Sequence, residues 1–255
     1  MKLKVLTYNI CSGHTFDTEQ AINNYEYDLS KASAVITQID PDICGLNELD
    51  NNQKRSAHDY QAEKLAKALG AKDFFFAPAL STSEDRPAEY GNAVLSKFPI
   101  VHKEILFPKM PELRDEPDNY EQRCVAHAVM QLPNGQTVTL LQTHFGLTIG
   151  ERQKMLELLL PLIDSIETPL LLMGDFNIRP ADWLLNPLRE RLTEVSEALG
   201  AKPFKTFPTY KTDYPDCKID YVFVSKHFKP LFMDIKQTQA SDHFPYYVEL
   251  ELQDK

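Results

Sequence analysis

Short apolar runs recur along the whole chain, and most of them have the length of a β-strand. They are rich in Val, Ile, Leu and aromatic residues and are bounded by polar residues, Gly or Pro, which is typical of buried strands. The runs are KVLTYNI, DICGLNEL, DFFFAP, NAVLSKFPIV, CVAHAVMQL, QTVTLLQTHF, PLLLMGDF, IDYVFVS and YYVELEL. The pattern therefore predicts a protein rich in β-sheet.

Helical spacing of apolar residues separates some of these runs. It covers 29–39, 61–69 and, most regularly, about 151–166. Residues on one face of a helix recur every three or four positions, and these segments follow that period. Pro161 falls inside the third segment, where we expect it to bend or break the helix because proline lacks a backbone N–H. Strands alternating with helices predict an α/β protein.

The sequence NGQT at 134–137 predicts a β-hairpin between two of the runs. We expect Asn134 and Gly135 to adopt the positive φ angles of a tight primed turn. The strands on either side would then pair antiparallel, so the predicted sheets are mixed.

Two longer polar segments, 108–121 and 202–218, read as loops rather than linkers, because strand-like sequence lies on both sides of each. No repeat or low-complexity segment divides the chain. We therefore predict one domain, 1–255.

No apolar run approaches the ~20 residues that span a bilayer, and the first residues lack the apolar core of a signal peptide. These features favour a cytoplasmic protein.

Charge and cysteine content narrow the classes of function. The formal net charge is −10, which opposes a large basic surface for nucleic acid, because Lys and Arg supply most of that affinity. An acidic cleft is instead typical of a hard-metal site. The four cysteines at 11, 44, 124 and 217 form no CxxC pair, so a zinc or redox motif has little support and reduced, mostly buried thiols are expected.

Polar side chains stand at the ends of the predicted strands. Strand ends on a rigid sheet can hold distant side chains in fixed positions, as metal and phosphate chemistry requires. Each residue alone has a structural alternative, such as a helix cap, a turn residue or a hydrogen-bonded histidine. Their occurrence together, in order along the whole chain, favours a catalytic site. The residues are Asn9, Glu48, His144, Asp175, Asn177, Asp220, Asp242 and His243.

The sequence resembles the endonuclease/exonuclease/phosphatase superfamily, which has the DNase I-like fold. The resemblance spans residues 7 to 245 and is carried by TYNI, LNEL, YGNAVLSKFPI, QTHF, GDFN, IDYVFVS and SDHFP. Within the superfamily, the size and the NEL…RS…YGNA arrangement look most like small bacterial metal-dependent hydrolases. The resemblance implies a four-layer α/β sandwich, two packed mixed β-sheets flanked by helices, with the active site at one edge.

The resemblance also implies a metal site. Glu48 would be the principal ligand of Mg²⁺ or Mn²⁺, with Asn9 and Asp242 nearby as ligands or water-holders. Some nuclease members carry an Asp two residues after the Asn of the first strand, where this chain has Cys11. That departure favours one tightly held metal ion over two.

Catalytic roles are implied for five further residues. Asp175 would orient or deprotonate the attacking water, and Asn177 would position water or a phosphoryl oxygen. His243 would donate to the phosphoryl group while Asp220 fixes its ring. His144 would bind phosphate or assist the leaving group.

Three other residues are candidate substrate contacts. Arg55 resembles the arginine of an Arg-Ser pair in the small-hydrolase branch, and Arg123 opens a predicted strand. Either guanidinium could bind a phosphate through its fork of donors, although a solvated or salt-bridged arginine is the structural alternative. Asn92 would face the cleft, or would be a turn partner of Gly91.

The loops, rather than the catalytic core, choose the substrate. Segment 202–218 interleaves lysines with aromatics, a pattern that either binds a single strand or covers the core. The favoured hypothesis is a metal-dependent phosphoesterase that hydrolyses a small or lipid-headgroup phosphodiester by metal-assisted attack of water. A DNA or RNA nuclease is the alternative, and a non-catalytic binding protein is a third. The sequence indicates no protein partner.

Overall fold

Two six-stranded sheets form the centre of the molecule in the computed structural model, which describes residues 1–15, 26–83, 85–112, 120–208 and 217–253. The first sheet has, in order, β13 (Phe228–Ile235), β14 (Tyr246–Leu252), β1 (Lys2–Asn9), β4 (Ile43–Asn51), β6 (Glu89–Ser96) and β5 (Asp73–Ser81). The second has β11 (Thr193–Glu194), β12 (Asp220–Val224), β10 (Leu170–Asp175), β9 (Thr137–His144), β8 (Val125–Gln131) and β7 (Ile100–Leu106). β2 (His14–Thr15) and β3 (Glu26–Tyr27) pair separately.

The two sheets have the same pattern of strand directions. A single parallel pair lies at the centre of each, β1 with β4 and β10 with β9. All the other pairings in the two sheets are antiparallel. Parallel neighbours end at the same sheet edge, so each sheet brings two strand ends together there.

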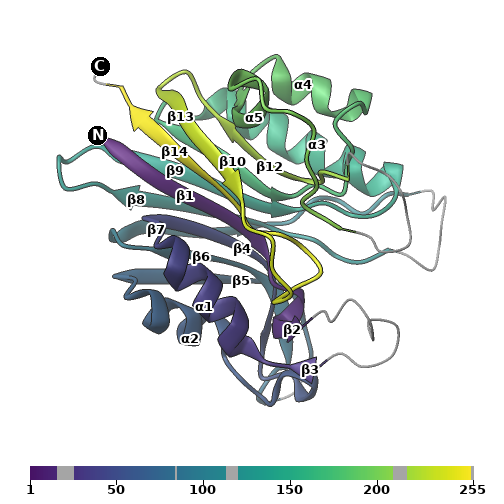
Figure 1. The fold of residues 1–255 in the computed structure, drawn as a ribbon. Helices are drawn as coiled ribbons and strands as arrows, with labels where there is room; N and C mark the ends of the chain where they lie inside the picture. The colour runs from purple at the N-terminus through teal and green to yellow at the C-terminus, as the bar shows by residue number, and fades with distance from the viewer. Residues whose placement is uncertain (16–25, 84, 113–119, 209–216, 254–255) are drawn as a thin grey trace.

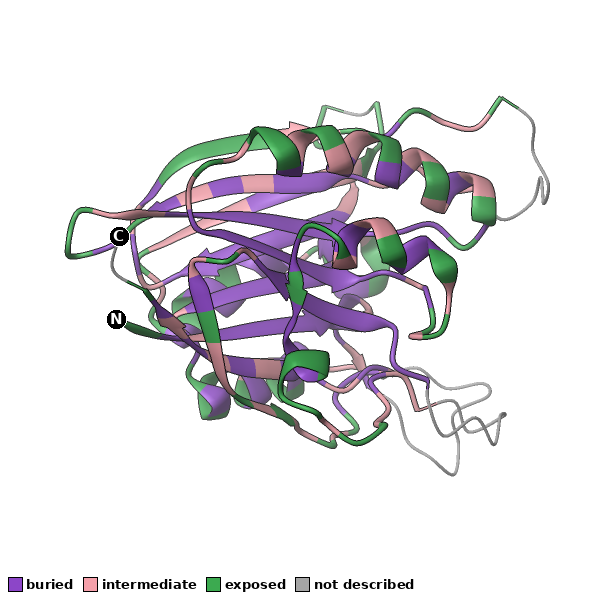
Figure 2. Ribbon diagram, turned by 90° about the horizontal axis from the view of Figure 1, so that it is seen from above, coloured by how far each residue is buried: buried purple, intermediate pink, exposed green. Residues whose placement is uncertain are grey.

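Helices cover the outer face of each sheet (Figure 1). α1 (Leu29–Ile39) and α2 (Gln61–Leu69) pack on the first sheet, while α3 (Ile149–Ser165) and α4 (Asn186–Arg189) pack on the second. A third apolar cluster fills the space between the sheets, and Figure 2 shows the buried strands inside the more exposed helices. This arrangement confirms the predicted four-layer α/β sandwich.

Shorter helical elements join these layers. They are η1 (Cys11–Gly13), η2 (Lys54–Ser56), η4 (Trp183–Leu185) and α5 (Val195–Ala198). Within the described residues, no helix is both long and apolar enough to cross a bilayer. The four cysteines are free thiols, and three of them are buried.

The helix predictions at 29–39 and 61–69 match α1 and α2 at both ends. The third helix begins two residues before the predicted start, at a capping box in which Thr148 and Glu151 satisfy each other's backbone N–H groups. The prediction that Pro161 would bend or break it is wrong in its stronger form, because α3 continues to Ser165. Buried contacts of Leu159 and Ile163 hold the helix on both sides of the proline.

The hairpin between β8 and β9 is confirmed, but its turn differs from the prediction. Gly135 has a φ of 83°, whereas Asn134 is not among the residues with positive φ. Leu132 accepts a hydrogen bond from the Gly135 N–H at 3.0 Å and donates to Gln136 O at 2.8 Å. A three-residue loop with glycine in the left-handed region therefore replaces the two-residue primed turn.

Two strand assignments also differ from the sequence pattern. The run NAVLSKFPIV is divided between β6 and β7, which belong to different sheets. β13 was not predicted, because the sequence FKPLFMDI mixes apolar and polar residues and contains Pro230. Proline cannot donate to a ladder and is tolerated in edge strands, and β13 is the edge of the first sheet.

Candidate active site

The strand registers bring the predicted residues to one edge of the sandwich. Asp175 is paired with His144 on one side and with Asp220 on the other. In the first sheet, Asn9 ends β1 and is paired with Asn47 of β4, one residue before Glu48. The loop that contains Asp242 and His243 leads directly into β14, the antiparallel neighbour of β1. Chain segments far apart in sequence thus meet because the central strands of both sheets end there.

Asp175 is the centre of the polar cluster. Its Oδ2 lies 3.1 Å from Asn9 Nδ2 and 3.5 Å from the Nε2 atoms of both His144 and His243. Its Oδ1 accepts the backbone N–H of Asn177 at 2.9 Å. Burial, together with the negative charges of Asp220 and Glu48, raises the pKa of Asp175. A carboxylate with a raised pKa is a better proton acceptor near neutral pH.

His243 and Asp220 form a buried dyad. His243 Nδ1 lies 2.9 Å from Asp220 Oδ2, and both side chains are buried. Burial alone would lower the pKa of His243, but the charges of Asp220 and Asp175 outweigh it and raise that pKa well above its usual value. The ring therefore remains protonated at neutral pH, with Nε2 directed toward Asp175.

His144 has the opposite protonation state. Arg123 donates to His144 Nδ1 at 3.0 Å, and because a guanidinium can only donate, Nδ1 is the acceptor nitrogen. Burial and the positive charges of Arg123 and His243 lower the pKa of His144 well below its usual value. The neutral ring then carries its hydrogen on Nε2, which faces Asp175 and Glu48 at 3.5 and 4.0 Å. The two histidines thus offer one neutral and one charged donor.

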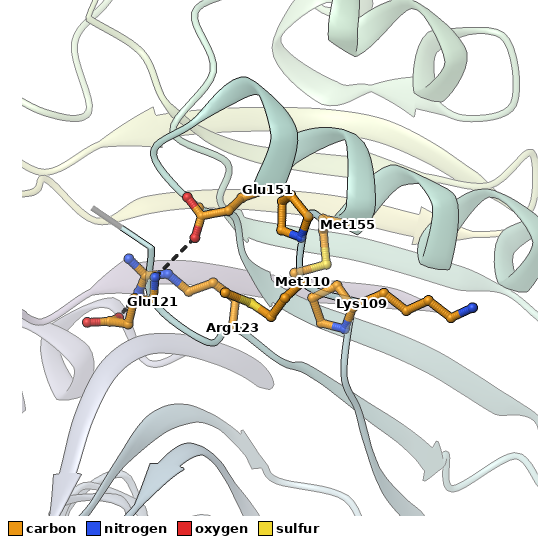
Figure 3. Close-up of a pocket in the computed structure, with 9 residues that line it drawn as sticks. Lys109, Met110, Glu121, Arg123, Glu151 and Met155 are labelled. Atoms are coloured by element: carbon orange, nitrogen blue, oxygen red, sulfur yellow. Dashed lines mark hydrogen bonds and ion pairs between the residues drawn. The ribbon is translucent and has the colours of Figure 1, made fainter. Parts of the chain in front are cut away.

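Arg123 pairs with Glu121, whose backbone is bound in turn by Glu151. Its guanidinium pairs with Glu121 at 2.7 Å, and Glu151 of α3 accepts the backbone N–H of Glu121 at 3.1 Å. Figure 3 shows these side chains around a small pocket beside Met110 and Met155. The same Glu151 carboxylate forms the α3 capping box, so the start of that helix is tied to the segment that orients His144.

Glu48 lies at a strained position in β4. Its φ is 59°, at a β-bulge between Leu46 and Leu49, and such strain in a non-glycine residue is typical of functional sites. The bulge aims the half-buried carboxylate toward Asn9, whose Nδ2 donates to it at 2.9 Å. Burial and the charge of Asp242 raise the pKa of Glu48.

These carboxylates fit a divalent cation. Glu48 and Asp242 repel each other, and a bound cation would relieve that repulsion. Carboxylate oxygens of Glu48 and Asp175 also lie within 4.8 Å of each other. Oxygen donors of this kind suit hard cations such as Mg²⁺. Burial and the nearby carboxylates raise the pKa of the Cys11 thiol.

Asn47 is a supporting residue that the sequence analysis missed. Its Oδ1 accepts from the backbone N–H of Asp175 at 3.0 Å and from Gln142 Nε2 at 2.9 Å, while its Nδ2 donates to Thr143 O at 2.8 Å. These bonds join the two sheets directly beneath the cluster. An amide at a buried strand position, one residue before the glutamate of LNEL, was the only signal for it in the sequence.

Asn92 lies in this supporting layer rather than at the surface of the cleft. It is buried, accepts a hydrogen bond from Asn47 Nδ2 at 2.8 Å and donates to Cys124 O at 2.9 Å. With both ends of its amide used inside the protein, its contacts favour a structural role over contact with substrate.

Arg55 lies at the rim of the cleft. Its guanidinium forms two hydrogen bonds with the buried Asp50, at 2.8 and 2.7 Å, and a third with Ser12 at 3.1 Å. Its side chain is 52% exposed and lies over the Tyr90 ring. Arg55 is therefore a salt-bridged arginine, which was the structural alternative to a phosphate contact. Part of its side chain remains accessible to solvent.

Segment 202–218 covers the core where the structure describes it. Lys218 is buried, pairs with Glu194 at 2.9 Å and lies over the Tyr221 ring. Phe207 lies 4.8 Å from the His243 ring, measured between centroids. Residues 209–216, with Tyr210, Lys211 and Tyr214, fall outside the described residues.

Comparisons with known proteins show relatives of the same fold. The chain is 26% identical to YbhP of Escherichia coli K12, a protein described as uncharacterized, over 98% of this chain and 96% of that one. Two solved structures have the same fold. An endonuclease/exonuclease/phosphatase from Bacteroides vulgatus has a TM-score of 0.77 at 20% identity, covering 99% of this chain and 100% of that one. A mannosyl-6-phosphatase from Bacteroides thetaiotaomicron has a TM-score of 0.70 at 20% identity, covering 98% and 100%.

The family model described as Endonuclease/Exonuclease/phosphatase family matches residues 6–243. This range begins within β1 and ends at His243, so it includes every strand end that contributes to the cluster. The chain is a member of the endonuclease/exonuclease/phosphatase family.

Proposed function

We propose that the protein is a divalent-metal-dependent phosphoesterase that hydrolyses a small phosphodiester by attack of water. The observation that carries the proposal is the convergence of Asn9, His144 and His243 on one oxygen of Asp175. A buried carboxylate surrounded by oriented donors is suited to accept a proton from water while the donors stabilise phosphoryl charge.

Glu48 and Asp242, with Asn9 beside them, would hold Mg²⁺ or Mn²⁺. When bound, the ion supplies positive charge that polarises the phosphoryl oxygens and neutralises the leaving oxygen. The mutual repulsion of Glu48 and Asp242 supports this ligand set.

The protein's own residues would divide the remaining tasks. Asp175 accepts the proton of the attacking water, and its Oδ1 is fixed by the Asn177 N–H. His243, kept protonated by Asp220, donates to a non-bridging phosphoryl oxygen. His144 offers its neutral Nε2–H to the phosphoryl group or to the leaving oxygen, because Arg123 occupies its other nitrogen.

Asn177 would complete the phosphate contacts. Its Nδ2 donates to Phe145 O at 3.0 Å, and no described residue accepts the second hydrogen of that amide. Its φ of 51° is in the left-handed region, which asparagine tolerates better than most residues. The second hydrogen of the amide would then be available to water or to a phosphoryl oxygen.

The charge balance of the cleft favours a diester over a monoester. Glu48, Asp175, Asp220 and Asp242 are acidic, and Arg123 is already paired with Glu121. A monoester dianion would meet more repulsion there than a diester monoanion. Arg55 and Lys218 also pair with carboxylates inside the protein, which weakens the case for a long nucleic acid.

Hydrolysis of bis-p-nitrophenyl phosphate, p-nitrophenyl phosphate and supercoiled plasmid, each with Mg²⁺, Mn²⁺ or EDTA, tests the proposal. We expect the diester to be the best substrate by kcat/KM and EDTA to abolish its turnover. Asp175→Asn should lower kcat by about 10²–10⁴-fold, as loss of a general base does.

Each other outcome points to a different conclusion. Faster turnover of the monoester would make the protein a phosphatase, and efficient nicking at nanomolar protein would favour the nuclease alternative. Full activity in excess chelator would exclude the metal-dependent mechanism. Turnover of none of the three substrates at high protein concentration would favour a binding protein.

A further inference from the structure

A second cluster of metal-ligand side chains lies outside the cleft, on β7 and β8. Glu104 of β7 is directly opposite His127 of β8 in the antiparallel register, and His102 is two residues before Glu104 on β7. Side chains two residues apart in a strand share a face. Val125 shares the face of His127 and packs in the cluster under α3, so the three side chains are on the outer face of the second sheet.

One carboxylate oxygen joins the two histidines. Glu104 Oε2 lies 3.1 Å from His127 Nδ1 and 3.5 Å from His102 Nε2, and the three ligand atoms lie within 4.8 Å of one another. Zn²⁺ binds imidazole nitrogen and carboxylate oxygen at about 2.0 Å, so neighbouring ligands of a tetrahedral ion are about 3.3 Å apart. The two distances to Glu104 bracket that separation.

The surroundings also suit a cation. Lys103 lies between His102 and Glu104 in sequence, but its side chain donates to Asp73 at 2.8 Å and to Phe74 O at 2.9 Å. Its positive charge is therefore directed away from the three ligands. The His102 and His127 rings meet edge to face, with centroids 4.9 Å apart, so they do not stack face to face.

We propose that His102, Glu104 and His127 bind Zn²⁺ or a similar borderline divalent cation, at a site separate from the catalytic cleft. Two imidazoles and one carboxylate favour Zn²⁺ over Mg²⁺, which prefers all-oxygen ligands. Because His102 and Glu104 are about half exposed, at 49% and 48%, solvent supplies the fourth ligand. The ion links β7, the edge strand of the second sheet, to β8 and so stabilises the pairing of these two strands.

Calorimetric titration with ZnCl₂ tests the site, using protein without a histidine tag. The Glu48→Gln background in excess Mg²⁺ suppresses Zn²⁺ binding in the cleft. We expect one Zn²⁺ per chain in this background. His102→Ala and His127→Gln should each weaken it by about tenfold or more, because each removes one of only three protein ligands. In the same Glu48→Gln background, Zn²⁺ should also raise the melting temperature of the protein that keeps both histidines, but not that of the His102→Ala/His127→Gln double variant.

A matched control and an activity assay make the result specific. His58 is an exposed histidine outside the cluster, so His58→Asn should leave Zn²⁺ binding unchanged. Asparagine is the replacement because His58 has a φ of 60°, which asparagine tolerates. In the wild-type background, the His102→Ala/His127→Gln variant should keep its Mg²⁺-dependent hydrolysis. If the double variant bound Zn²⁺ as tightly as its parent, or if the Kd of the parent for Zn²⁺ exceeded about 100 µM, the three residues would be only a surface ion-pair cluster and the proposal would be wrong.

Discussion

At the scale of single residues, environment gives identical side chains different tasks. His144 and His243 lie at equal distances from Asp175, 3.5 Å each. Burial lowers the pKa of both rings; the charge of Arg123 lowers that of His144 further, whereas Asp220 and Asp175 raise that of His243. Neighbouring charge, rather than residue type, thus decides which histidine keeps a proton at neutral pH.

The dyad is testable by two single variants and their combination. His243→Ala and Asp220→Asn should each lower kcat by about 10²–10⁴-fold. The double variant should be little worse than the worse single variant, because the two residues act as a unit. Fully multiplicative losses, measured at saturating Mg²⁺, would show that they act independently.

The pH profile adds a second measurement. Asp220 raises the pKa of His243, so Asp220→Asn should lower that pKa and release the proton at lower pH. The alkaline limb of kcat/KM should therefore move toward lower pH in this variant. An unchanged alkaline limb would mean that some group other than His243 supplies the proton.

Glu48 is testable through the metal requirement. Glu48→Gln keeps the shape of the side chain but removes its charge, and the Mg²⁺ concentration for half-maximal activity should rise by about tenfold or more. Glu63→Gln, on the exposed side of α2, is the matched control. Calorimetric titration of the wild type with Mg²⁺ should fit one strong site, because Cys11 stands where a second carboxylate would be needed. Two strong sites would contradict this.

At the scale of elements, the cleft depends on close approach between β9 and β10. Gly174 has a φ of 142°, and a Cβ at that position would lie 1.8 Å from Thr143 O. Backbone atoms cannot move aside as a flexible side chain can. The glycine of GDFN therefore allows Asp175 and His144 to stand side by side at the end of the parallel pair.

Gly174→Ala should consequently destabilise the protein by about 1–3 kcal/mol, the usual cost of forcing extra atoms into a packed site. Urea unfolding measures this. Gly135→Ala is the control, since Gly135 also has a positive φ but a Cβ there would meet nothing within 4 Å. It should cost about 1 kcal/mol or less, from the backbone alone. Equal losses in the two variants would show that the contact with Thr143 has no special effect.

At the scale of the whole molecule, the net charge of −10 acts against polyanions. Affinity for duplex DNA comes mainly from phosphate neutralisation by Lys and Arg, and Arg123 and Lys218 are already paired internally. Fluorescence anisotropy with a labelled duplex should show poor binding at 150 mM salt. Tight, strongly salt-dependent binding would contradict this and favour the nuclease alternative.

The sequence by itself determined the α/β class of the protein and the polar strand ends that form the cluster, while the resemblance to the family implied the four layers. Strand and helix periods reflect burial on one face, which is a local property, so α1 and α2 were predicted to the residue. The motifs LNEL, GDFN and SDHFP identified Glu48, Asp175 and His243 because they join apolar strands to polar ends.

Only the tertiary structure decided how those residues are paired and charged. Asn47 holds the two sheets together through partners 95, 96 and 128 positions away in sequence, and no local pattern encodes contacts at that distance. Asn92 was a candidate substrate contact, and Lys218 belongs to a segment that could have bound a nucleic-acid strand, but both side chains are buried. Their roles depend on which way a strand faces and on what packs against it, and the packing of the two sheets sets both.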